Sequence, residues 1–145
     1  MVKIYFCGSI RGGRQLALTY AKIIEMIQQH GRVLTEHLGD DAEIQSKDRV
    51  LSDRAIHDRD MEWIVESDLL VADVTVPSLG VGYEIGRAVE MDKPILCLFN
   101  TESKHTLSAM IAGIDGLEVL YYKDPEELEG ALKQFITQHA AHRTS

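Results

Sequence analysis

Short apolar runs along this chain alternate with longer stretches in which apolar residues recur every three or four positions. The runs have the length of strands, and the recurrence every three or four residues in the longer stretches is typical of helices. Strands are predicted at 2–6, 33–35, 69–74, 95–99 and 117–122. Helices are predicted at 16–27, 53–67, 81–91 and 107–111 and from Asp124 toward Ile136. Residues 39–48 are polar without periodicity, and we expect a loop there.

The order of these elements predicts the fold class. Strands that alternate with helices are joined by right-handed crossovers into a parallel sheet covered on both faces. The runs 69–74 and 95–99 are almost wholly apolar, which is typical of strands buried on both sides. We therefore expect one α/β domain over residues 1–145, a Rossmann-like (flavodoxin-like) three-layer sandwich with about five parallel strands.

Polar clusters follow four of the predicted strands directly, at residues 8–14, 35–37, 75–84 and 100–103. In parallel α/β sheets, ligands bind beyond the carboxyl ends of the strands. We expect these clusters to converge on one rim of the sheet.

The first cluster, Gly-Ser-Ile-Arg-Gly-Gly-Arg at residues 8–14, opens a helix directly after a strand. Free backbone N–H groups and the helix dipole favour an anion at such a place, so the cluster predicts a cradle for phosphate or sugar. The alternative is a glycine-rich turn with two solvated arginines. The spacing is neither the dinucleotide fingerprint nor the ATP-binding pattern, which weakens an oxidoreductase or ATPase interpretation.

The second cluster ends at Glu84, which falls in the first turn of the helix predicted from Val81. Gly80 and Gly82 let the backbone pass close to a ligand. The helix dipole is expected to lower the pKa of Glu84 and keep it ionised, as a glycosidic nucleophile requires. The alternative is an ordinary glutamate that stabilises the start of the helix.

Asp60 is a second candidate carboxyl. It lies one helical turn from Ile56 and from Ile64, which places it on an apolar stripe of the predicted helix. Burial there is expected to raise its pKa, and two carboxyls with separated pKa values form an acid and nucleophile pair. A buried aspartate satisfied by hydrogen bonds is the alternative. Asp73, at the end of an apolar strand, is interpreted as structural and bonded to backbone N–H groups, and the alternative is a side chain that orients a base or sugar. Tyr5 is interpreted as either a core residue or a partner of a carboxylate.

Composition limits the kinds of ligand, location and cofactor that we expect for this protein. The net charge of −8 argues against a nucleic-acid polymer, because such binding uses clustered Lys and Arg. The apolar runs are too short to span a membrane and the first residues do not resemble a signal peptide, so we expect a cytoplasmic protein. Cys7 and Cys97 are interpreted as core thiols, and the scattered histidines indicate neither a metal nor another cofactor.

Residues 5–14, 34–37, 56–60, 77–88 and 107–111 together resemble the 2′-deoxynucleoside 5′-phosphate N-hydrolases of the nucleoside 2-deoxyribosyltransferase superfamily. The resemblance implies hydrolysis of the N-glycosidic bond of 2′-deoxynucleoside 5′-monophosphates. It implies that Glu84 attacks the anomeric carbon and forms a deoxyribosyl-enzyme, that Asp60 assists departure of the base, and that Tyr5 orients the nucleophile.

The resemblance also implies the substrate contacts. Arg11, Ser78 and Gly80 match residues that hold the 5′-phosphate, and Ser108 matches a serine from the other subunit, so a homodimer with shared sites is expected. We further hypothesise that crowding around the sugar by Tyr5 and Ile10 disfavours ribose. The full set of expected substrate-binding residues is Gly8, Ser9, Ile10, Arg11, Gly12, Ser78, Gly80, Ser108 and Met110.

Two other functions remain open at this point. A nucleoside 2-deoxyribosyltransferase would pass the same intermediate to a second base instead of to water. A non-catalytic nucleotide-binding module would keep the glycine-rich loops and need neither carboxyl.

Overall fold

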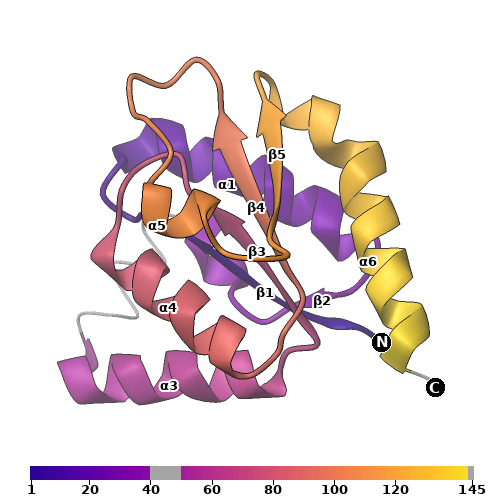
Figure 1. Ribbon diagram of the computed structural model, residues 1–145. Coiled ribbons are helices and arrows are strands. Elements are labelled where there is room, and N and C mark those ends of the chain that lie inside the picture. The colour runs from indigo at the N-terminus through magenta and orange to yellow at the C-terminus, as the bar shows by residue number, and fades with distance from the viewer. Residues whose placement is uncertain (40–49, 144–145) are drawn as a thin grey trace.

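In the part of the chain that the structure describes, a sheet of five parallel strands forms the centre of the molecule (Figure 1). The computed structural model describes residues 1–39 and 50–143. The strand order is β2-β1-β3-β4-β5, and every neighbouring pair is parallel. This is the flavodoxin-like order, and it confirms the predicted fold class. The strands are β1 (Lys3–Gly8), β2 (Arg32–Val33), β3 (Leu69–Asp73), β4 (Ile95–Asn100) and β5 (Glu118–Tyr122).

Helices cover both faces of the sheet (Figure 1). Side chains alternate between the faces of a strand, so Ile4 and Phe6 pack with α1 and α6, whereas Tyr5 and Cys7 face α3 and α4. Within the described ranges, no helix is both long enough and apolar enough to cross a membrane. The helices are α1 (Gly13–Gln28), α3 (Asp53–Glu66), α4 (Leu79–Glu90), α5 (Ala109–Ala112) and α6 (Glu129–Arg143), with 3₁₀ turns η1 (Glu36–Gly39) and η2 (Pro125–Leu128).

The start of α4 differs from the prediction. Ser78 is the N-cap, and its hydroxyl oxygen accepts a hydrogen bond from the Val81 N–H at 3.2 Å. This cap lets the helix begin at Leu79, two residues earlier than expected, although the Leu79 side chain is 97% exposed. Glu84 consequently lies in the second turn of α4.

Two other boundaries also differ. The second strand ends at Val33 because Thr35 turns inward, where its hydroxyl oxygen accepts from the Phe6 N–H at 3.0 Å and its hydroxyl donates to the Phe6 carbonyl. The final helix is preceded by the 3₁₀ turn η2, and within the described part of the chain Asp124 makes no side-chain capping bond. The expected loop at 39–48 falls almost entirely outside the described residues.

The strand order reverses between β1 and β3, so the connections that leave these two strands lead to helices on opposite faces of the sheet, α1 and α4. Gly8 and Asp73 are paired in register at this point. Asp73 is fully buried and accepts hydrogen bonds from the Tyr122 hydroxyl at 2.6 Å and the Thr75 N–H at 3.0 Å. Its structural interpretation is confirmed, because both of its carboxyl oxygens accept hydrogen bonds within the protein.

Candidate active site

A cavity of about 280 Å³ lies beyond the carboxyl end of β1, between α3 and the start of α4. Segments far apart in the sequence meet here: β1 and the loop after it, Thr35 before η1, and the two helices. The predicted convergence of polar clusters on one rim is confirmed, because all the strands that they follow are parallel. Three of the four clusters line this cavity; the fourth, residues 100–103, lies beside it in the sheet, where the Asn100 N–H donates to Thr75 at 2.8 Å. Among the expected site residues, the cavity is lined by Tyr5, Gly8, Ile10, Arg11, Asp60, Ser78, Gly80 and Glu84.

The Glu84 carboxyl faces this cavity from the second turn of α4. Burial, and next the negative charge of Asp60, raise the pKa of Glu84 to about 7. The thiol of Cys7 and the hydroxyl of Tyr5 offset part of this rise as donors toward the carboxylate. Among the described residues, none completes a hydrogen bond to the buried Oε2. The two carboxyl oxygens therefore differ, since Oε2 is shut off from solvent and Oε1 lies toward Gly80 at the start of α4.

The predicted effect of the helix dipole on Glu84 is wrong. The dipole acts within the first turn of a helix, and the capped start at Ser78 moves Glu84 beyond it. Burial then dominates, so the pKa rises where the sequence predicted a fall.

Asp60 lines the same cavity from α3, and its side chain is 21% exposed. Arg59 Nε donates a hydrogen bond to Asp60 Oδ1 at 3.0 Å, so the surroundings of Asp60 are less apolar than the helix pattern predicted. Residues adjacent in sequence do not normally face each other on a helix, which is why spacing alone could not find this pair. The arginine side chain also runs along α3 toward Trp63, and its Cζ lies over the indole ring, 4.9 Å from the centroid.

Tyr5 and Cys7 reach the carboxyls from β1, on the face that packs against α3 and α4. Burial, followed by the charge of Glu84, raises the pKa of both the Tyr5 hydroxyl and the Cys7 thiol. Both groups therefore stay protonated and present a hydrogen toward Glu84. Cys7 is buried as predicted, but the sequence analysis did not predict that its thiol lies close to Glu84. The available signal was its position two residues after Tyr5, which places both side chains on the same face of the strand.

The loop after β1 contributes Ile10 and Arg11 to the cavity. Ser9 is buried, and its hydroxyl oxygen accepts from the Arg11 N–H at 3.3 Å, which shapes the loop from behind. Gly8 is required by packing, since a Cβ there would lie 2.5 Å from Tyr20 Cζ. Gly12 is also closely packed, because a Cβ at this position would lie 2.3 Å from Leu16 Cδ2. Neither Ser9 nor Gly12 lines the cavity.

Ser78 and Gly80 form the part of the cavity at the start of α4. A Cβ on Gly80 would come 4.0 Å from Glu84 Oε1, so a larger side chain would extend beside the Glu84 carboxyl. Arg11 supplies a cation in the same cavity. Exposed N–H groups at a helix start and an arginine together suit an anionic group.

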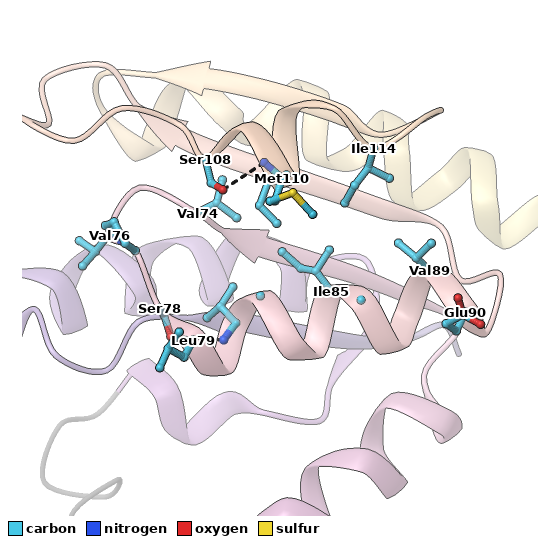
Figure 2. Close-up of a pocket in the computed structure, with 15 residues that line it drawn as sticks. Val74, Val76, Ser78, Leu79, Ile85, Val89, Glu90, Ser108, Met110 and Ile114 are labelled. Carbon is cyan, nitrogen blue, oxygen red and sulfur yellow. Dashed lines mark hydrogen bonds between the residues drawn. The ribbon is translucent and has the colours of Figure 1, made fainter.

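Ser108 and Met110 are not brought to this cavity. They line a separate, largely apolar groove of about 680 Å³ between α4 and α5 (Figure 2). Ser108 caps α5 by accepting a hydrogen bond from the Met110 N–H at 3.2 Å, and Met110 is 82% exposed. Figure 2 shows both residues across the groove from Leu79 and Ile85. Ser78 borders both the groove and the Glu84 cavity.

Within the described ranges, no three His, Cys, Asp or Glu side chains are grouped as a metal site would require. The cavity combines a flavodoxin-like switch point with two nearby carboxyls and an arginine beside the start of a helix. These features define an α/β protein with a polar site at the carboxyl edge of its sheet.

The sequence matches the nucleoside 2-deoxyribosyltransferase family over residues 4–135, and the chain belongs to this family. It is 53% identical over 138 residues to a 5-hydroxymethyl-dUMP N-hydrolase from Esox lucius, covering 92% of this chain and 94% of that protein. The Homo sapiens 5-hydroxymethyl-dUMP N-hydrolase is 51% identical over 138 residues, with coverage of 92% and 78%. A Clostridium botulinum CMP N-glycosidase has the same fold, with a TM-score of 0.68, 21% identity and coverage of 91% and 98%.

Proposed function

We propose that this protein hydrolyses the N-glycosidic bond of 2′-deoxynucleoside 5′-monophosphates, releasing the free base and 2-deoxyribose 5-phosphate. The observation that carries the proposal is the cavity that holds Glu84 and Asp60 together with the anion cradle of Arg11 and the start of α4. The N-hydrolase relatives support the same reaction class and a deoxynucleotide substrate.

Glu84 is the proposed nucleophile. Its carboxylate attacks C1′ of the sugar, the C1′–N bond breaks with its electron pair on the base, and an ester links the sugar to Glu84. Water then attacks C1′, the ester bond breaks, and Glu84 is regenerated. Both transition states carry positive charge on the sugar ring, which a carboxylate stabilises.

The other cavity residues take supporting roles. Asp60 assists departure of the base, and Tyr5 orients Glu84 as a hydrogen-bond donor. Arg11, Ser78 and Gly80 hold the 5′-phosphate at the positive end of α4. Tyr5 and Ile10 both line the cavity, which supports our hypothesis that they crowd a ribose 2′-hydroxyl. Cleavage of the ribonucleotide as fast as its deoxy counterpart would refute that hypothesis.

We also propose that the protein is a homodimer whose subunits share their active sites. Ser108 lies on the groove that adjoins the Glu84 cavity through Ser78, and not in the cavity itself. The groove is bordered by the highly exposed Leu79 and Met110, which a second copy would cover. In the dimer, Ser108 of one copy completes the phosphate site of the other. Because free nucleotides occur inside cells, we propose a cytoplasmic location.

The decisive experiment incubates the protein with a panel of deoxynucleoside monophosphates and free deoxynucleosides, with and without an acceptor base. We expect base release from the monophosphates and 2-deoxyribose 5-phosphate as the sugar product, even with an acceptor base present. Predominant exchange of bases would instead favour the transferase. Free deoxynucleosides should be poor substrates, because they lack the phosphate that the cradle binds.

Glu84→Gln separates catalysis from simple nucleotide binding. The amide keeps the shape of the side chain but cannot attack C1′, so base release should fall by at least about 10³-fold while nucleotide binding remains. Glu62→Gln, an exposed glutamate on α3, is the matched control and should keep normal turnover. Normal turnover by Glu84→Gln would favour a non-catalytic binding module.

A further inference from the structure

Arg59 occupies an unusual place for a surface-helix arginine. It lies on α3, lines the cavity that contains Glu84, and its side chain is only 20% exposed. Its Nε donates to Asp60 Oδ1 at 3.0 Å, and its Cζ lies 4.9 Å from the centroid of the Trp63 ring. The guanidinium therefore stands inside the proposed active site, in direct contact with one of its two carboxyls.

The geometry keeps this arginine in one place. Residues 59 and 63 are four apart, so they share a face of α3, and the planar guanidinium stacks on the indole. Trp63 is half-buried, which gives the stack a firm support. Arginine stays protonated at any ordinary pH, so Asp60 always has a cation at hydrogen-bond distance.

A fixed cation at this distance has a direct consequence for Asp60. An opposite charge within hydrogen-bond distance favours the ionised form of a carboxyl. The charge-assisted hydrogen bond also fixes the orientation of the carboxylate, because Oδ1 accepts from Arg59 Nε. Asp60 is thereby suited to act as an oriented anion and poorly suited to hold a proton.

We propose that Arg59 is a positioning residue that holds Asp60 as an oriented carboxylate anion beside Glu84. The inference rests on the proposed function and specifies how Asp60 assists departure of the base. Asp60 stabilises the positive charge that develops on the sugar as the C1′–N bond breaks. The base leaves with the electron pair and takes a proton from water. The water that later attacks C1′ releases a proton in turn, so the whole reaction consumes one water.

The competing assignment makes Asp60 the proton donor to the leaving base. The two assignments require different charge states, since the donor must be protonated while Glu84 is ionised, whereas the anion requires both carboxyls ionised. Other groups facing the pair also influence its titration. Among the described residues that line the cavity, these groups are Tyr5 and Cys7 on β1, Arg11 in the following loop, and Arg59 itself on α3.

Three variants test the role of Arg59. Arg59→Met removes the charge but keeps an unbranched stem that can cover Trp63. Arg59→Lys keeps the charge and loses the planar fork, so it should restore part of the activity. Arg54→Met is the matched control: Arg54 also lies on α3 and pairs with an aspartate, Asp58 at 3.8 Å, but its side chain is 91% exposed and outside the cavity.

The first measurement is the pH profile of base release. Without the cation, the doubly ionised pair forms only at higher pH, so the acidic limb of kcat/KM for Arg59→Met should move upward by about 1 unit. At saturating substrate, kcat should fall about tenfold or more with KM little changed, because the lost interaction acts in the transition state. Arg54→Met should match the wild type.

An alkaline limb in the wild-type profile that moves to higher pH in Arg59→Met would show that protonated Asp60 supports the reaction, because removal of the cation raises the pKa of the proton donor, and it would overturn the proposal. An unchanged profile in Arg59→Met, or an equal change in Arg54→Met, would also overturn it.

The second measurement does not depend on activity. Carbon-13 NMR of labelled carboxyls follows the titration of Glu84 in the free protein, with the resonance assigned by its loss in Glu84→Gln. In Arg59→Met the midpoint should rise by about 1 unit relative to the wild type. An unmoved midpoint would overturn the role of Arg59. Absence of base release by the wild type would instead overturn the proposed function, so the two failures are distinguishable.

Discussion

Burial raises the pKa of Glu84 and the positive end of a helix lowers it, and the position of Glu84 along α4 decides which effect is larger. The positive end of a helix stabilises an anion only within the first turn. Glu84 lies beyond that turn, shielded from water and close enough to Asp60 to feel its negative charge, so its pKa rises to about 7. At neutral pH the folded protein therefore exists as a mixture of protonated and ionised Glu84.

This pKa predicts the pH dependence of the reaction. Only ionised Glu84 can attack C1′, so kcat/KM for a deoxynucleoside monophosphate should rise with pH and level off above about pH 7. The substrate phosphate also ionises, near pH 6. Binding of inorganic phosphate, followed over the same pH range, separates that contribution. A rate that is flat or falls between about pH 6 and pH 8 would contradict the assignment of Glu84 as nucleophile.

The same pKa makes a prediction about stability. The folded state holds the Glu84 proton up to about pH 7, whereas an ordinary glutamate releases it near 4.5. The free energy of unfolding should therefore decrease between these pH values, because the folded state binds more protons there. Glu84→Gln cannot ionise and should be more stable than the wild type by about 1–3 kcal/mol near pH 8.

Chemical denaturation of both proteins near pH 4 and pH 8 checks this expectation. The advantage of Glu84→Gln should shrink near pH 4, where Glu84 is neutral in both the folded and the unfolded state. An equal difference at the two pH values would mean that the substitution acts through packing and not through ionisation.

At the scale of elements, apolar continuity was enough to predict β3 and β4, because both strands are buried on two faces. It was not enough at the start of α4, where the helix begins with the almost fully exposed Leu79 and depends on the Ser78 cap. The two carboxyls could be found from spacing and resemblance. The contact between Arg59 and Asp60 could not, since it depends on how one long side chain folds over Trp63.

The end of β1 packs closely against Tyr20 of α1, and this packing requires a glycine at position 8. A Cβ there would lie 2.5 Å from Cζ of Tyr20, a buried residue whose hydroxyl donates to the Ser9 carbonyl at 3.1 Å. Gly8→Ala must displace the ring, and we expect it to reduce the free energy of unfolding by about 1–3 kcal/mol. Chemical denaturation measures this change.

Gly130→Ala on α6 is the control for Gly8→Ala, because a Cβ there has nothing within 4 Å. That substitution should stabilise the protein by about 0.5–1 kcal/mol through the lower entropy of the unfolded chain. If Gly8→Ala proves as stable as the wild type, the contact with Tyr20 does not explain the glycine.

At the scale of the whole molecule, the proposed active site spans two surfaces that meet at the start of α4. The Glu84 cavity lies on one side and the apolar groove with Ser108 on the other, and Ser78 borders both. Within one chain, the serine expected to bind phosphate is thus separated from the nucleophile. A second copy seated in the groove would bring its own Ser108 toward Ser78, which is the arrangement proposed for the homodimer.

Subunit complementation tests this arrangement. Glu84→Gln lacks the nucleophile and Ser108→Ala lacks the phosphate ligand, so each variant should be strongly impaired as a homodimer. If Ser108 acts across the interface, a mixed dimer contains one complete site, formed by Glu84 of one subunit and Ser108 of the other. Random mixing of equal amounts makes half the dimers mixed, so activity should recover to about a quarter of the wild-type value. If both residues instead acted within one chain, each mixed dimer would contain two defective sites, and mixing would give only the average of the two variants. Base release measured before and after exchange of subunits, with dimer formation followed by light scattering, distinguishes these outcomes.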